Sequence, residues 1–188
     1  LDQSTILKLA AGEIIDRPVS IVKECIENSI DAGASKIIID TVQGGIAEIR
    51  IEDNGCGILN NDMSLAVEPH ATSKLVEFQD LDHVMSMGFR GEALASISEV
   101  ADVTIHSFNP SDDIGSELIK SAGHGITLAK KAREKGTTIL VQHLFKKVPV
   151  RFRFLKSPAS EGNLITRLIQ QFSLHYPMIQ FEYKNNHV

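Results

Sequence analysis

The sequence predicts an α+β domain in which helices pack on one face of a mixed, mainly antiparallel sheet. Amphipathic helical patterns stand near both ends of the 188-residue chain, and short β-branched segments separated by turn residues run between them. The composition, 43% hydrophobic and 23% charged, is that of a globular protein rather than a disordered one. A chain of this length can form one domain whose core needs no disulfide or metal.

Helices are predicted where apolar side chains recur every three or four residues, and strands where β-branched residues follow one another between turns. Pro18 separates the first two helices, because proline disfavours helical backbone in the residue before it. Gly33 suits the position after the second helix, and Gly44-Gly45 supplies the first strand-to-strand turn. The predicted helices cover 4–15, 19–32, 62–67, 92–98 and 160–174, and the predicted strands cover 36–42, 46–53, 100–107, 116–121, 125–129, 137–142 and 179–183.

One long segment, 69–91, has no steady periodicity. It is rich in Ser, Thr, Gly and charged residues, and a helical turn over 80–85 is the regular feature expected within it. A loop of this length in a compact domain is usually functional or mobile.

The composition also excludes several classes of protein. There are 19 basic and 24 acidic residues, a net charge of −5, which argues against a dedicated nucleic-acid coat but not against a local basic patch. No apolar run reaches the roughly 18 residues of a membrane-spanning helix, and no targeting peptide is visible. Cys25 and Cys56 stand alone, as in a reducing compartment. We therefore expect a cytoplasmic protein without membrane contact and, because the chain starts at Leu1, a piece of a longer one.

Polar side chains share one face of the helix predicted over 19–32. Glu24, Glu27, Asn28 and Asp31 are spaced i, i+3, i+4 and i+7, opposite an apolar stripe. Such a face is commonly just solvated. Here three like charges repel with no basic residue on that face to offset them, and an asparagine inside a helix is mildly unfavourable. A carboxylate and an amide oxygen one turn apart can hold Mg²⁺ and position a water, since Mg²⁺ prefers oxygen ligands.

Three further elements combine glycine with polar residues. Asp53-Asn54-Gly55-Cys56-Gly57 follows a predicted strand, so its aspartate can accept a hydrogen bond from a ligand's amino group, although an ordinary turn explains these residues equally well. Gly88–Leu94 opens a predicted helix, whose first amides can bind an anion, and His70–Lys74 adds hydroxyls and a cation. Gly136-Thr137-Thr138 enters a strand, where a threonine hydroxyl can reach a ligand.

Together these elements resemble the GHKL ATPase superfamily and, most closely, the MutL family of DNA mismatch-repair proteins. The GFRGEAL sequence is nearly diagnostic of that family, whereas DxGxG alone is shared with gyrase, the large heat-shock chaperones and histidine kinases. The resemblance implies the Bergerat fold and an ATPase that uses ATP and Mg²⁺. It also implies that 1–188 form the nucleotide-binding subdomain, with an ATP lid over about 69–91. The matching segments are ECIENSIDAG at 24–33, DNGCG at 53–57, HATSK at 70–74, GFRGEAL at 88–94 and GTT at 136–138.

The resemblance also implies a role for each matching residue. Glu24 matches the general base that activates water, and Asn28 matches the Mg²⁺ ligand. Asp53 matches the carboxylate that recognises the adenine amino group, and Thr137 matches a threonine near adenine. Gly57 lies where the backbone closes on the nucleotide. The ATP lid is matched by Thr72, Ser73 and Lys74, and the loop that wraps the phosphates by Gly88, Phe89, Arg90 and Gly91.

The chain departs from the family pattern in two places. Pro69 stands where the family has a basic residue before HATSK, which affects the entry into the lid. Lys147-Val148-Pro149-Val150-Arg151 replaces Asn-Thr-Pro-Ala-Arg, so we expect that loop to make different contacts. The resemblance further implies a second subdomain, which supplies a lysine to the γ-phosphate, and a C-terminal domain, both absent from this chain. We therefore expect weak ATP hydrolysis from these residues alone.

Basic residues gather after the nucleotide-binding elements. Nine lysines and arginines between 130 and 156 stand against one acid, Glu134. They form either an ordinary solvated surface or a contact with the DNA backbone, which needs charge but no base-reading motif. The residues expected to contact DNA are Lys146, Lys147, Arg151 and Arg153, and the phenylalanines expected in the core between them are Phe145, Phe152 and Phe154.

The resemblance implies partners for the full-length protein as well. Its N-terminal domains form an ATP-dependent homodimer that acts as a clamp on DNA, between a mismatch-recognition protein and a downstream nuclease or helicase. The protein is then bacterial-type, cytoplasmic and nucleoid-associated during repair. Two alternatives remain. The first is a non-hydrolysing scaffold. Glu24 argues against it, because a protein that does not hydrolyse ATP has no requirement for a carboxylate at that position. A histidine-kinase catalytic domain is opposed by GFRGEAL and by the lack of a phospho-acceptor helix.

Overall fold

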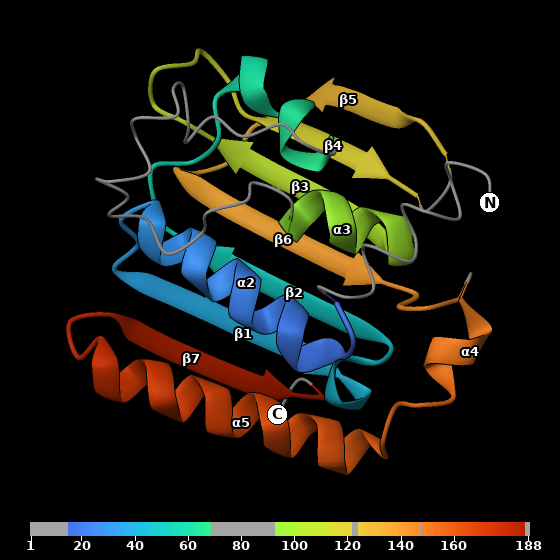
Figure 1. Cartoon of the computed structure of the whole chain (residues 1–188). Helices are drawn as coiled ribbons and strands as arrows, with labels where there is room; N and C mark the ends of the chain where they lie inside the picture. The colour runs from blue at the N-terminus through green and yellow to red at the C-terminus, as the bar shows by residue number, and fades with distance from the viewer. Residues whose placement is uncertain (1–14, 69–92, 122–123, 147, 187–188) are drawn as a thin grey trace, which may run out of the picture.

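The computed structural model describes residues 15–68, 93–121, 124–146 and 148–186, and it contains a seven-stranded sheet (Figure 1). The strand order is β5-β4-β3-β6-β2-β1-β7. Neighbouring strands are antiparallel except β1 and β7, which are parallel. The strands are β1 (Lys36–Val42), β2 (Glu48–Asp53), β3 (Asp102–Phe108), β4 (Ser116–Lys120), β5 (Ile126–Lys130), β6 (Gly136–Gln142) and β7 (Gln180–Asn185).

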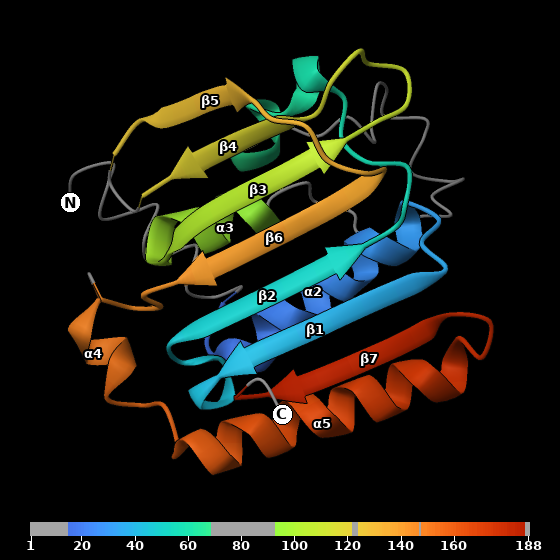
Figure 2. The same cartoon turned by 180° about the vertical axis from the view of Figure 1, so that it is seen from behind.

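The helices cover one face of this sheet. Helices α2 and α3 lie over the sheet in Figure 1, and the view from behind shows strands with no described helix in front of them (Figure 2). The predicted α+β class, with a mainly antiparallel sheet and helices on one face, is confirmed. The α-helices are α2 (Pro18–Asp31), α3 (Ala93–Val100), α4 (Pro149–Phe152) and α5 (Pro158–His175), and the short 3₁₀-helices are η1 (Gln43–Gly45), η2 (Asn60–Asp62) and η3 (Leu65–Val67).

Helix α2 forms where its sequence favours one. Pro18 takes the first helical position, where its missing N–H costs nothing, and Gly33 follows the helix with a φ of 70°. Ile21, Val22 and Cys25 are fully buried on the face that meets the sheet. They join a core cluster with alternate residues of β1 and β2, because inward-facing side chains recur every second residue along a strand.

Several element boundaries differ from the prediction. The strand expected from residue 100 begins at Asp102, because Ala101 still donates its N–H to the carbonyl of Ile97 at the end of α3. The helix expected over 62–67 is divided into η2 and η3. The four-residue α4 was not predicted. The helix expected over 4–15 lies outside the described residues apart from its last position, as does the irregular segment 69–91.

Candidate functional site

The polar face of α2 carries Glu24 and Asn28 one helical turn apart. Both are half-buried, and the Glu24 side chain is 28% exposed. The expectation that no basic residue offsets the acids on this face is wrong. The Lys23 Nζ lies 2.8 Å from a carboxylate oxygen of Glu27 and 3.7 Å from Glu24. Burial acts to lower the pKa of Lys23, but Glu27 and Glu24 together raise it above its usual value.

The second part of the site is a row of three residues across three strands. Asp53, the last residue of β2, pairs with Thr137 of β6, and Thr137 pairs on its other side with Ser107 of β3. All three are buried. The Oγ atoms of Ser107 and Thr137 lie within hydrogen-bond distance, at 2.9 Å. The sheet therefore brings together Asp53 and Thr137, the two residues whose predicted roles concern adenine, and adds Ser107.

The Asp53 carboxylate is held from two directions. The Ser29 hydroxyl of α2 donates to its Oδ2 at 3.0 Å, and the Gly55 N–H donates to its Oδ1 at 2.8 Å. Because Ser29 directly follows Asn28, this bond ties the helix that carries Glu24 and Asn28 to the strand end that carries Asp53. The predicted catalytic and adenine-recognising residues thus belong to one connected structure.

Burial raises the pKa of Asp53 above its usual value. Hydrogen bonds from Gly55, Ser29 and the Thr137 backbone act against burial, as does the charge of Arg133. Burial, with the charges of Glu24 and Asp53, also raises the pKa of the Cys25 thiol to about 12. Cys25 is therefore a neutral packing residue beneath the site and not a nucleophile.

Two glycines at this end of the sheet, one in the turn after β2 and one at the start of β6, are packed too closely to carry side chains. Gly57 has a φ of 76°, and a Cβ there would lie 2.1 Å from the Phe108 carbonyl oxygen. Gly136 has a φ of 121°, and its Cβ would lie 2.1 Å from the carbonyl oxygen of Asp53. Only glycine fits such close backbone approaches. The requirement for glycine at Gly57 thus arises within the protein, and its approach to a nucleotide stays a prediction.

Asn54 fixes this turn to the end of α2. Its Oδ1 accepts hydrogen bonds from the backbone N–H groups of Ser35 and Lys36, each at 2.9 Å. The Cys56 N–H donates to the Ala32 carbonyl at 2.8 Å. These bonds hold the turn against the loop between α2 and β1, so the spacing between the polar face of α2 and Asp53 is set by the backbone.

The sequence analysis does not identify Ser29 and Ser107 as site residues, although each is a polar residue at an inward-facing position of an apolar pattern. Ser29 stands four residues after Cys25, within the apolar stripe of α2, and Ser107 follows Val103 and Ile105 on the inward side of β3. A polar residue at an inward position needs a hydrogen-bond partner. For Ser107 these partners include the Ile58 N–H, which donates to its Oγ at 2.8 Å, and the Gly136 carbonyl.

Part of the predicted site lies outside the described residues. The expected lid and phosphate contacts stay predictions for Thr72, Ser73, Lys74, Gly88, Phe89, Arg90 and Gly91. Within the described ranges, no group of three His, Cys, Asp or Glu side chains could hold a metal by itself. The oxygens of Glu24 and Asn28 suit Mg²⁺, which commonly takes one or two protein ligands and completes its shell with phosphate and water.

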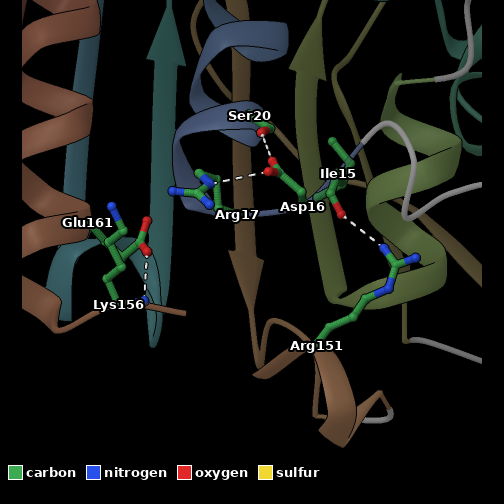
Figure 3. A network of polar contacts seen from close by, with 7 residues as sticks. All are labelled: Ile15, Asp16, Arg17, Ser20, Arg151, Lys156 and Glu161. Atoms are coloured by element: carbon green, nitrogen blue, oxygen red, sulfur yellow. Dashed lines mark hydrogen bonds and ion pairs between the residues drawn. The ribbon is translucent and has the colours of Figure 1, made fainter. Parts of the chain in front are cut away.

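The structure divides the predicted basic segment into two groups. Lys130, Lys131, Arg133 and Lys135 lie before β6, and the remaining basic residues follow it, so a strand about 23 Å long separates the groups (Figure 1). In the second group, Lys146 and Arg153 are exposed. The Arg151 guanidinium donates to the Ile15 carbonyl at 3.3 Å (Figure 3). Lys147 lies outside the described residues.

The same region corrects the prediction for the phenylalanines. Phe145 is fully buried, as expected, but Phe152 is 50% exposed and Phe154 is 78% exposed. The expectation of a core position is wrong for these two. The physical reason is that α4 is a single turn that projects beyond the end of β6 and away from the helical layer (Figures 1 and 2).

A polar network closes the other end of α2, next to α4. The Asp16 carboxylate accepts hydrogen bonds from Ser20 at 2.6 Å and from Arg17 at 3.2 Å (Figure 3). Burial acts to raise the pKa of Asp16, but these two partners lower it below its usual value. Nearby, the buried Glu161 accepts a hydrogen bond from the Lys156 N–H at 2.9 Å. The Asp16 contacts fix the chain where it enters α2, and the Glu161 contact fixes the chain where it enters α5.

Comparison with known proteins gives consistent matches. Residues 17–138 match a family described as histidine kinase-, DNA gyrase B- and HSP90-like ATPases. The chain is 45% identical over 187 residues to the DNA mismatch repair protein MutL of Clostridium beijerinckii, covering 100% of this chain and 28% of that protein. It is 44% identical over 179 residues to MutL of Pseudothermotoga lettingae, covering 95% of this chain and 33% of that one. The chain thus spans about a third of the length of these relatives.

Solved structures show the same fold. The ATPase domain of Aquifex aeolicus MutL complexed with ADP superposes with a TM-score of 0.71 at 30% identity, covering 92% of this chain and 61% of that one. The N-terminal domain of a DNA repair protein superposes with a TM-score of 0.80 at 30% identity, covering 96% and 52%. In the part of the chain that the structure describes, no helix is long and apolar enough to cross a membrane.

Proposed function

The chain belongs to the family of histidine kinase-, DNA gyrase B- and HSP90-like ATPases, and from this membership we propose that it binds ATP with Mg²⁺ between α2 and the end of β2 and hydrolyses it. The observation that carries the proposal is the buried Asp53 carboxylate. Its register with Thr137 and its bond to Ser29 support the proposal, because they hold a carboxylate that can accept from an amino group beside the helix that carries Glu24 and Asn28.

Each residue of this site has a chemical task in the proposed reaction. Asp53 accepts a hydrogen bond from the adenine amino group, and Glu24 takes the proton of the attacking water. Asn28 and the phosphates would hold the Mg²⁺ ion, which when bound neutralises negative charge on the phosphate oxygens. The segment 69–91 supplies the lid that excludes water, as active-site lids do in many enzymes.

For the whole protein we propose the function of its relatives. The identity of 41–45% to MutL proteins over nearly the full chain supports a role in DNA mismatch repair. ATP-driven closure of the lid would promote homodimerisation and couple a mismatch-recognition protein to a downstream nuclease or helicase on DNA, in the cytoplasm. A second subdomain, like the part of the relatives' ATPase domains that this chain does not match, would complete the ATPase.

A binding and turnover experiment tests this proposal. We expect ADP and ATP to bind this chain in isothermal titration calorimetry, with Mg²⁺ strengthening the binding of ATP. We expect slow turnover from this chain and a large increase in a chain extended to the full ATPase domain. The extension would add the lysine that the second subdomain is expected to supply to the γ-phosphate, and a charge that stabilises the transferred phosphoryl group usually has a large effect on the rate. Absence of nucleotide binding in both chains would refute the site, and equal turnover would refute the contribution of the second subdomain.

We further propose that the group of basic residues after β6 contacts the DNA backbone. Lys146 and Arg153 are exposed there, beside the exposed α4. Arg151 is partly engaged with the Ile15 carbonyl, so it serves the fold as well. Binding through phosphate contacts is independent of base sequence and weakens as added salt reduces the advantage of releasing counterions.

Charge-reversal variants distinguish the contribution of the basic group after β6 to DNA binding from that of the group before it. The variant K146E/R153E is expected to weaken binding to duplex DNA and to reduce the salt slope, by about one for each phosphate that is no longer neutralised. The double variant K130E/K135E, in the basic group before β6, reverses the same number of charges and serves as the matched control, which should change neither. Fluorescence anisotropy from 50 to 200 mM salt is the measurement. An unchanged slope in K146E/R153E, or an equal reduction in the control, would contradict the assignment.

A further inference from the structure

Arg133 lies directly behind the candidate adenine end of the site. In the sequence it is one of nine basic residues in a segment that suggests DNA contact, but its guanidinium is engaged within the fold. Its Nη1 donates to the Thr138 Oγ1 at 3.0 Å and to the His106 carbonyl, and its Nε donates to the Glu134 carbonyl at 2.9 Å. The side chain therefore bridges β3 and β6 and is half-buried between them.

The position of this bridge is defined by the sheet register. His106 pairs with Thr138, and Thr138 pairs with Glu52. This row is one residue away from the row of Ser107, Thr137 and Asp53. Because successive side chains of a strand point to opposite faces, Arg133 acts from the face of the sheet that no described helix covers, whereas Asp53 and Thr137 face α2 (Figure 2).

Asp53 is a buried carboxylate, and Arg133 is a positive charge that acts on it. The carboxylate is 7% exposed, and burial in a medium less polar than water disfavours its charged form. The charge of Arg133 lowers the pKa of Asp53, as do the hydrogen bonds from Gly55, Ser29 and Thr137, whose effects are larger; all four act against burial, which raises it. A guanidinium keeps its charge at neutral pH even where, as here, burial lowers its pKa.

We infer that Arg133 is a positioning residue of the nucleotide site: it clamps β3 to β6 beside Thr137 and Ser107, and it supplies the positive charge that keeps Asp53 ready to accept the adenine amino group. This inference rests on the proposed function, since it assigns Asp53 to nucleotide recognition. In this role Arg133 acts through its neighbours and does not itself contact the nucleotide.

Other polar and charged groups act on this part of the site. From α2, the Ser29 hydroxyl donates to Asp53, and the charge of Asp53 helps to raise the pKa of the neutral Cys25 thiol. On β2, the charges of Glu52 and Arg50 act on Arg133. On β3, burial lowers the pKa of His106, and the charges of Arg133 and Lys131 lower it further. His106 is therefore a second titratable group close to Arg133, and it needs its own control.

The test is the pH dependence of ADP affinity, measured by calorimetry from about pH 4, close to the usual pKa of an aspartate, up to about pH 8. Affinity should fall on acidification, as Asp53 gains a proton. In Arg133→Gln the midpoint of this fall should move upward by about 0.5 to 1 pH unit, at the low end of what a neighbouring opposite charge produces. On the acidic side of the midpoint, that shift corresponds to a roughly three- to tenfold loss of affinity. ADP titrates too, but identically in every variant, so midpoints are compared between variants.

Three matched variants make the test specific. Arg133→Lys keeps the charge and should hold the midpoint at its parental value, with affinity lowered equally at every pH. Lys135→Gln removes an exposed charge from the same loop, and His106→Gln removes the neighbouring titratable group; neither should move the midpoint. Thermal melting monitors folding, and if Arg133→Gln does not fold, a shifted midpoint in Arg133→Lys still overturns the electrostatic role.

The outcomes separate this inference from the proposed function. If the parental chain binds ADP and Asp53→Asn weakens that binding, the nucleotide site stands. An unmoved midpoint in Arg133→Gln then shows that Arg133 acts only on the structure. If the parental chain does not bind ADP at any pH, both the proposed function and the inference fail.

Discussion

Replacement of Glu24 by alanine is expected to lower ATP turnover by about 10²- to 10⁴-fold, the usual contribution of a positioned general base. ADP affinity should change little, because Glu24 lies on α2 and the hydrogen bonds that hold Asp53 come from Ser29 and Gly55. Glu24→Gln keeps the shape of the side chain and should show the same loss. Turnover and ADP binding are measured on the extended ATPase domain, where the parental rate is high enough to resolve a loss.

The ion pair with Lys23 provides the control for this prediction. If Glu24 matters only through the 3.7 Å contact with Lys23, then Lys23→Ala should lower turnover as much as Glu24→Ala. We expect Lys23→Ala to have a small effect, because partly exposed ion pairs contribute about 0–1 kcal/mol. Glu27→Gln, on the same face of α2, should also be close to the parental rate. A Glu24 variant that turns over at the parental rate would remove the general base from the proposal.

Replacement of Asp53 by alanine is expected to weaken ADP binding by roughly tenfold or more, because a hydrogen bond to a charged group contributes about 1.5–3 kcal/mol. The variant should also lose about 1–3 kcal/mol in the free energy of unfolding, since the Ser29 hydroxyl and the Gly55 N–H lose their acceptor. Calorimetry and urea denaturation measure the two effects. Asp113→Asn, in an exposed loop, is the control for the loss of one negative charge.

The raised pKa of Asp53 gives opposite pH dependences to binding and to stability. Binding requires the carboxylate, so ADP affinity falls as the pH drops through the raised pKa. The free energy of unfolding instead rises as the pH drops through this range, because the folded chain holds this proton more tightly than the unfolded chain. The pH-dependent part of the Asp53 contribution to stability is therefore fully present below its unfolded pKa and is lost as the pH rises through its folded pKa, whereas the hydrogen bonds from Ser29 and Gly55 remain. Parallel pH profiles of affinity and stability for this residue would contradict its assignment.

Local pattern was sufficient for the elements that depend on neighbours in sequence. The limits of α2 follow from Pro18 and Gly33, and β1 covers the β-branched run of residues 36–42 as predicted. Glu24 and Asn28 could be paired without a structure, because one helical turn fixes their spacing. The family resemblance was visible for the same reason, since each motif is a short continuous segment.

The interpretation of single residues failed where their partners are distant in sequence. The sequence shows Arg133 only as one member of a basic segment, because its partners, His106 and Thr138, become its neighbours only when β3 and β6 pair. Phe154 was placed in the core because an apolar side chain is commonly buried, but the single turn of α4 leaves it in solvent. Periodicity gives no information on such contacts.

By itself, therefore, the sequence determined the class of the fold, the face of α2 that bears the chemistry, and the motifs that belong to this ATPase family. Only the tertiary structure decided that β6 lies between β2 and β3, which places Thr137 between Asp53 and Ser107. It also decided that Ser29, rather than a residue of the turn alone, holds the Asp53 carboxylate. The reason is that strand order and helix packing follow from burial of the whole core, whereas helical spacing and turn chemistry are set within a few residues.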